Sequence, residues 1–152
     1  MPGLIDLLDV NVWLGLAAEA HVHHRPAEQY WHNEAAPTTA FCRLTQLALL
    51  RHLTNKSIMG THFLPPRAAW KKWSQFLALP EVQLATEPAG LDERLGKFCD
   101  LGPTSPNLWT DAYLAAFAKC AGLRLVTFDA GFSRFDGLDL LILEPTSATQ
   151  AG

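Results

Sequence analysis

The chain has 152 residues, of which 49% are hydrophobic and 18% are charged, and its formal net charge is −3 at pH 7. This composition is typical of one globular domain with its own hydrophobic core. No apolar run approaches the roughly 20 residues that cross a bilayer, and the first residues carry carboxylates where a signal peptide carries Lys or Arg. The sequence therefore excludes a membrane-spanning chain and predicts a cytoplasmic protein.

The first third of the chain predicts two strands and two helices. Residues 4–8 form a short apolar run that ends at Asp9, and the segment NVWLGLAA at 11–18 has helical character. A second helix is expected over 25–35, with Pro26 in its first turn. A strand follows at Thr38 to Cys42. The chain thus opens as strand, helices, strand.

The middle third predicts two more helices separated by a loop. In residues 44–55, apolar side chains recur at intervals of three and four, with Thr45 available as the N-cap and Gln46 in the first turn. Pro66 begins the next helix, which continues to Leu79. One face of that helix carries Trp70, Trp73 and Leu77. We expect these side chains to belong to the core.

The last third predicts a strand over 82–86 and a helix that opens at Pro88 and runs through Phe98. The pair Ser105 and Pro106 then starts a helix that ends at Gly122. Buried strands are expected over 123–128, which ends at Asp129, and over 138–143. The remaining residues, 145–152, are interpreted as a flexible tail.

Strands and helices that alternate without hairpin signals predict βαβ units and a mostly parallel sheet. Residues 1–144 are therefore expected to form a single α/β domain. Its three cysteines, Cys42, Cys99 and Cys120, stand far apart and form no C-x-x-C pair. We expect them to be buried, reduced thiols.

Two strand ends in this scheme deliver an aspartate to the same sheet edge, Asp9 and Asp129. Ligands of parallel sheets bind beyond the carboxyl ends of the strands, and Asp111 can arrive there from a neighbouring helix. Carboxylate oxygens are the ligands that Mg²⁺ and Mn²⁺ prefer. The sequence predicts a divalent metal site, although each aspartate alone could merely cap a helix, complement its dipole or start a turn.

Four segments together resemble the PIN-domain ribonucleases of the VapC toxin family. They are LLDVNVWLGL at 7–16, LTQLALLRHL at 44–53, WTDAYLAAFA at 109–118 and LVTFDAGF at 125–132. The resemblance follows nearly the whole chain in order and spacing. It implies a PIN-like three-layer α/β/α fold with a mostly parallel central sheet.

The resemblance also implies a function. Asp9, Asp111 and Asp129 would be the catalytic, metal-binding acids of a Mg²⁺-dependent endoribonuclease, with Mn²⁺ as an alternative ion. Supporting polar groups would come from Asn11, Gln46, Asn107 and Thr127. The products would carry a 3′-hydroxyl and a 5′-phosphate. As the toxin of a toxin-antitoxin module, the protein would form a homodimer and bind a VapB-type antitoxin.

One position departs from the family pattern. The first turn of the third helix usually carries a glutamate within a Thr-Glu pair, and here the pair reads Thr45-Gln46. An amide oxygen can ligate Mg²⁺ but brings no charge and accepts no proton at neutral pH. The alternative function is therefore a catalytically weakened PIN module that binds RNA or an antitoxin without efficient cleavage.

The distribution of charge indicates an RNA-binding face. No acidic residue occurs between Glu34 and Glu81, while this stretch holds half of all Lys and Arg. Such a stretch can attract a polyanion, although it could also be an ordinary solvated surface. The candidates for contacts with the RNA backbone are Arg43, Arg51, Lys56, Lys71 and Lys72.

Three further interpretations stay open or are disfavoured. His21, His23 and His24 could suggest zinc, but no distal Cys or His spacing supports it, and a polar loop is favoured. Asp9-Val-Asn11 is similar to the haloacid-dehalogenase phosphatase motif but lacks its second aspartate. Trp13 and Trp31 could belong to the antitoxin-binding surface or to the core.

Overall fold

A computed structural model describes residues 4–101 and 104–145 of the chain. Its centre is a five-stranded sheet in the order β3-β2-β1-β4-β5, and all pairs are parallel. The strands are Ile5–Leu8 (β1), Thr38–Phe41 (β2), Val82–Leu84 (β3), Arg124–Thr127 (β4) and Leu140–Ile142 (β5). The predicted parallel α/β sheet is confirmed.

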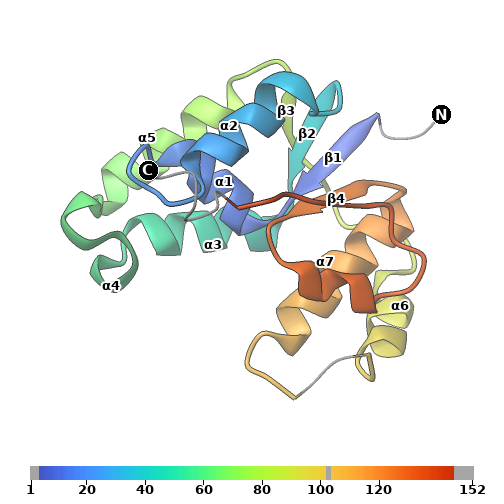
Figure 1. The fold of residues 1–152 in the computed structure, drawn as a ribbon. Helices are drawn as coiled ribbons and strands as arrows, with labels where there is room; N and C mark the ends of the chain where they lie inside the picture. The colour runs from blue at the N-terminus through green and yellow to red at the C-terminus, as the bar shows by residue number, and fades with distance from the viewer. Residues whose placement is uncertain (1–3, 102–103, 146–152) are drawn as a thin grey trace.

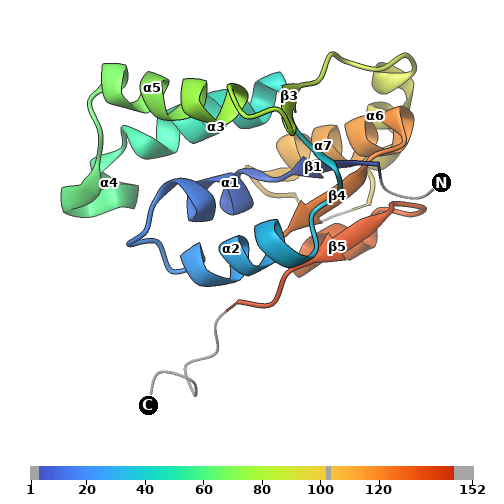
Figure 2. The ribbon, with the colours of Figure 1, turned by 90° about the horizontal axis from the view of Figure 1, so that it is seen from above.

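Helices cover both faces of this sheet (Figures 1 and 2), as the prediction of three layers required. One face carries α6 and α7, and the other carries α1, α2, α3 and α5. The α-helices are Val10–Ala17 (α1), His24–Asn33 (α2), Arg43–Leu53 (α3), Lys56–Met59 (α4), Pro66–Leu77 (α5), Leu91–Phe98 (α6) and Leu108–Ala121 (α7). Two short 3₁₀ segments are Gly60–His62 (η1) and Ala130–Arg134 (η2).

The strands alternate between two hydrophobic cores because successive side chains of a strand point to opposite faces. In β1, Leu7 packs toward α7 and Leu8 packs toward α1 and α3. In β4, Leu125 packs in the same core as Leu7, and Val126 packs in the same core as Leu8. All four leucine and valine side chains are fully buried. This two-sided burial explains why the strands read as continuous apolar runs.

The sheet topology has a switch point between β1 and β4. From β1 the chain moves to β2 on one side, and it later returns to β4 on the other side. The connecting helices therefore lie on opposite faces, and a crevice opens beyond the carboxyl ends of β1 and β4. Asp9 and Asp129 follow these two strand ends.

A buried ionic network ties the opposite end of β1 to its neighbours. Asp6 is fully buried and accepts hydrogen bonds from both Nε and Nη2 of Arg124, at 2.8 and 2.9 Å. Its carboxylate also accepts the hydroxyl of Tyr30 and the backbone N–H of Ala36. The network joins β1, β4 and α2, and thereby fixes the strand pair that carries the crevice.

Several helix starts differ from the sequence prediction. Helix α3 begins after Cys42, and Thr45 is not its N-cap: the Thr45 side chain lies in the first turn and accepts the backbone N–H of Cys42 at 3.0 Å. Helix α6 begins at Leu91 rather than Pro88, because Gly90 takes the left-handed conformation (φ 83°) just before it.

The start of α7 also differs. Ser105 and Pro106 form a turn in which the Ser105 carbonyl accepts the backbone N–H of Leu108, and the helix follows this turn. The loop expected between residues 55 and 66 contains α4 and η1. Short segments of this kind leave no long periodic pattern to detect.

Burial corrects two expectations for the core. Trp73 is 6% exposed, but Trp70 is 53% exposed and lies outside the core. Trp13 is fully buried and stacks on Phe41 at 3.8 Å between ring centroids, so it is a core residue and not a docking surface. Trp31 is partly buried against the same core.

Of the three cysteines, Cys42 is buried, whereas Cys99 and Cys120 are partly exposed, contrary to expectation. No helix of the described ranges has the length and apolar character needed to cross a membrane. The tail expected over 145–152 lies, except for Pro145, outside the residues that the structure describes.

Candidate metal centre

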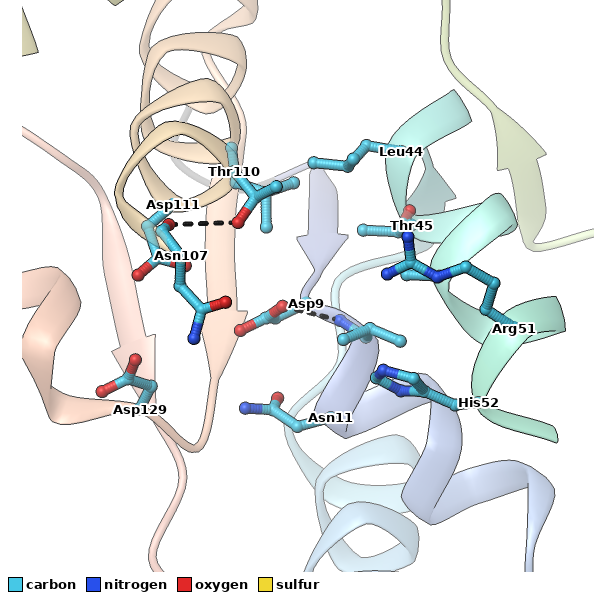
Figure 3. Close-up of a pocket in the computed structure, with 13 residues that line it drawn as sticks. Asp9, Asn11, Leu44, Thr45, Arg51, His52, Asn107, Thr110, Asp111 and Asp129 are labelled. Carbon is cyan, nitrogen blue, oxygen red and sulfur yellow. Dashed lines mark hydrogen bonds between the residues drawn. The ribbon is translucent and has the colours of Figure 1, made fainter. Parts of the chain in front are cut away.

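The three predicted acids face one cavity of about 310 Å³ at the topological switch point. Asp9 lies at the end of β1, Asp129 at the end of β4, and Asp111 in the first turn of α7 (Figure 3). Helix α3 forms another wall of this cavity. The sequence therefore predicted correctly that these carboxylates gather at one sheet edge.

Asp9 is the most deeply placed of the three, with 8% of its surface exposed. Its Oδ1 accepts the backbone N–H of Val10 at 2.7 Å and caps α1, while Oδ2 accepts the hydroxyl of Thr127 at 2.8 Å. Burial, with a smaller contribution from the charges of Asp111 and Asp129, raises the pKa of Asp9 to about 6, although both hydrogen bonds oppose this rise. A cation in the cavity would relieve the cost of ionising this carboxyl group.

Thr127 connects the acids through one buried hydroxyl. Besides donating to Asp9, its Oγ1 accepts the backbone N–H of Asp129 at 3.0 Å and the Nδ2 group of Asn11 at 3.4 Å. The Oδ1 atom of Asn11 in turn accepts the backbone N–H of Phe128 at 3.4 Å. Two of the four predicted supporting residues, Thr127 and Asn11, therefore lie beside the acids and orient the two strand ends.

Asp129 and Asp111 have separate partners. Asp129 accepts the backbone N–H of Gly131 at 2.8 Å, which starts η2. Asp111 accepts from Nη2 of Arg134 at 3.2 Å. Burial raises the pKa of Asp111, and Arg134 partly offsets that rise. Sequence reasoning missed Arg134, and the only signal was its position five residues after Asp129.

Asn107 borders the same cavity at the beginning of α7. It is the N-cap residue, and its carbonyl accepts the hydroxyl of Thr110 at 3.0 Å, while its side chain makes no capping bond. The amide is directed toward the cavity in Figure 3. Asn107 thus lies where the sequence placed a supporting polar group.

Gln46 does not line the cavity. Its side chain is 2% exposed, and its Oε1 accepts from Nη1 of Arg43 at 2.6 Å. The α3 residues that do line the cavity share another face of the helix: Leu44, Thr45, Ala48, Arg51 and His52. An acidic group on α3 would therefore face the aspartates from position 48, not from position 46.

The predicted RNA-binding residues are dispersed. Arg51 lines the cavity, whereas Arg43 is paired with Gln46. Lys56 lies over the ring of Phe63 at 4.8 Å in the α4 region, and α5 carries Lys71 and Lys72. Lys72 borders a separate groove with Met59 and Leu64. The structure thus brings only Arg51 of the five to the acids.

The donor set at the cavity has the chemistry of a site for a hard divalent cation. It offers carboxylate oxygens from three aspartates and the amide oxygens of Asn11 and Asn107. As the side chains stand, however, no three His, Cys, Asp or Glu residues of 4–101 and 104–145 are close enough to enclose a metal ion. A bound ion would therefore require side-chain adjustment at the cavity.

Comparison with known proteins defines the class. The family model of the PIN domain matches residues 7–138. This match runs from the second half of β1 past β4 and includes all three aspartates. The fold is thus that of a PIN domain.

Individual relatives narrow the assignment. Ribonuclease VapC41 of Mycobacterium tuberculosis is 42% identical over 142 residues, which are 90% of this chain and 97% of that protein. Ribonuclease VapC38 of the same organism is 32% identical and covers 82% of this chain and 85% of its own length. The chain belongs to the PIN domain family and, within it, to the VapC ribonucleases.

Solved structures share the fold at low identity. Mycobacterium tuberculosis VapC20, described as a Sarcin-Ricin loop cleaving toxin, superposes with a TM-score of 0.67 at 17% identity, over 91% of this chain and 99% of that chain. VapBC2 from Rickettsia felis, bound to a DNA fragment from its promoter, superposes with a TM-score of 0.65 at 18% identity, over 92% and 99%. The PIN fold is therefore confirmed.

Proposed function

We propose that this protein is a metal-dependent endoribonuclease that acts as the toxin of a VapBC-type module. The observation that carries the proposal is the gathering of Asp9, Asp111 and Asp129 at one cavity in a chain of the VapC family. Three acids from distant parts of the sequence meet at the switch point of the sheet. Repulsion among them makes physical sense if a cation resides there.

The ion is proposed to be Mg²⁺, with Mn²⁺ as a substitute, held by Asp9, Asp111 and Asp129. When bound, such an ion polarises a phosphodiester and lowers the pKa of the attacking water. Asp9 would be the inner anchor, because Val10 and Thr127 fix both of its oxygens from the protein side. Thr127 and Asn11 would keep the strand ends in register, and Asn107 would add an amide at the opposite edge.

Arg134 is proposed to hold Asp111 in place before an ion binds. Its Nη2 lies 3.2 Å from Asp111, and its Nη1 donates to the Gly131 carbonyl at 2.6 Å. The guanidinium therefore neutralises part of the acidic cluster in the metal-free protein. An ion would compete with Arg134 for this carboxylate.

RNA is the proposed substrate, and Arg51 is the predicted basic residue best placed to contact it at the cavity. Arg43, Lys56, Lys71 and Lys72 would contribute at most to long-range attraction of the backbone. Such attraction weakens as salt is added. The products would carry a 3′-hydroxyl and a 5′-phosphate.

The proposed partners are a VapB-type antitoxin and a second copy of the chain. Support comes from the family and from structural neighbours that are VapBC complexes. The proposed setting is the cytoplasm. The weakened-module alternative rests on Gln46, which is buried and hydrogen-bonded to Arg43, and it stays a second proposal that the cleavage assay decides.

Cleavage of total cellular RNA by the purified, partner-free protein tests the proposal. We expect discrete fragments with Mg²⁺ or Mn²⁺ that disappear with EDTA and in Asp9→Asn. Asp92→Asn is a matched control, because Asp92 is exposed on α6 and does not border the cavity. Fragments that persist in EDTA, or in Asp9→Asn, would contradict the proposal.

A further inference from the structure

Two basic side chains line the cavity on the wall formed by α3. Arg51 and His52 are consecutive residues in the last turn of that helix. Figure 3 shows them across the cavity from Asp111 and Asp129. The cavity therefore has an acidic wall and a basic wall. This arrangement suits a phosphate group, which can face a cation on one side and hydrogen-bond donors on the other.

His52 differs from an ordinary surface histidine. It is only partly exposed, and its Nδ1 is buried without a hydrogen-bond partner in the part of the chain that the structure describes. Burial and the neighbouring charge of Arg51 lower the pKa of His52, so the ring is neutral at pH 7. A neutral imidazole carries one N–H group and one acceptor nitrogen.

The position of that single proton follows from the cost of burial. A buried N–H without a partner is rare and unfavourable, more so than an under-satisfied acceptor. The proton is therefore favoured on Nε2, the other nitrogen of a ring that borders the cavity. His52 presents a directional, uncharged donor beside the flexible charge of Arg51.

We propose that His52 is a phosphate-binding residue whose Nε2–H donates to a non-bridging oxygen of an RNA phosphate held between Arg51 and the aspartates. The identity of this ligand rests on the proposed function. Arg51 supplies the charge that attracts the phosphate, and His52 fixes its orientation.

Binding of a fluorescently labelled single-stranded RNA, with Ca²⁺ in place of Mg²⁺ so that the aspartates stay neutralised, tests this role through affinity and not through cleavage. We expect His52→Leu to weaken binding about tenfold, because a hydrogen bond to a charged oxygen is lost. His52→Gln keeps an N–H donor and should retain most of the affinity. His32→Leu is the matched control, since His32 is exposed on α2 and does not border the cavity.

Thermal unfolding of each variant separates binding from folding. Unchanged RNA affinity in a folded His52→Leu protein would overturn the inference, as would equal losses in His52→Leu and His52→Gln. A wild-type protein that binds RNA through His52 but never cleaves it would contradict the proposed function and leave this inference standing. Cleavage that is unchanged in His52→Leu would contradict this inference and leave the proposed function standing.

Discussion

The Thr127 hydroxyl donates a 2.8 Å hydrogen bond to Oδ2 of Asp9, and Oγ1 of Thr127 also accepts the backbone N–H of Asp129. One fully buried side chain of β4 therefore positions two of the three acids. Partners of this kind set the orientation of a metal ligand. Thr127 is the residue through which the two strand ends are coupled.

Replacing Thr127 by Val should lower metal-dependent cleavage about 10- to 100-fold, the usual cost of losing a partner of a metal ligand. Because the Thr127 bond lowers the pKa of Asp9, its loss should also move the pH dependence of metal binding upward. Thr127→Ser keeps the hydroxyl and should retain most of the activity. Steady-state cleavage and metal titrations at several pH values would measure both effects. Equal activity in Thr127→Val and the wild type would argue against this coupling.

Replacing Asp9 by Asn should stabilise the metal-free protein near neutral pH. The pKa of Asp9 is raised from 3.8 to about 6, so the ionised form is costly in the folded state. The free energy of unfolding should rise by roughly 1–3 kcal/mol, since the Asn oxygen can still accept the Val10 N–H while its Nδ2 group donates to the Thr127 hydroxyl oxygen. Chemical denaturation in EDTA measures the difference. A less stable Asp9→Asn protein would mean that Asp9 is chiefly structural.

The same pKa predicts the pH dependence. Between about pH 4 and pH 6 the folded state holds the Asp9 proton more tightly than the unfolded state, so stability without metal falls as pH rises through this window. Metal binding has the opposite dependence, because the ion needs the ionised carboxylate. We expect Mg²⁺ to raise the melting temperature strongly near pH 7.5 and weakly near pH 5. Equal stabilisation at both pH values would exclude Asp9 as a ligand.

The structure also predicts where a fourth carboxylate can act. Gln46→Glu would bury a charge beside Arg43 and should not increase cleavage, whereas Ala48→Glu would add an acid to the cavity wall. We expect Ala48→Glu to tighten Mg²⁺ binding, as measured by calorimetry. Gln46→Asp provides a second buried variant for comparison. An increase in cleavage for Gln46→Glu alone would show that position 46 reaches the metal.

The strand ends and the acids that follow them could be predicted from the sequence because both signals are local. A buried apolar run followed by an aspartate marks Asp9 and Asp129, and parallel strands bring their ends together. The first turn of α7 carries Asp111 within a strong helical pattern. For these elements, local pattern and tertiary position agree.

The α3 side of the site could not be predicted in the same way. Periodicity shows that positions 44, 48 and 51 share a helix face, but not whether that face meets the core or the cavity. The outcome depends on the orientation in which α3 packs against its neighbours. In the structure this orientation places Ala48 and His52 at the cavity and buries Gln46 in the protein interior. Trp70 and Trp73 illustrate the same limit, because only one of them packs inward.

The most direct test of the account is a Mn²⁺ titration followed by electron paramagnetic resonance, which detects the free ion. The wild type should bind Mn²⁺ at the cavity, and Asp9→Asn, Asp111→Asn and Asp129→Asn should each weaken that binding at least tenfold, while Asp92→Asn should match the wild type. Undiminished binding in all three cavity variants would contradict the assignment of these aspartates as a metal centre.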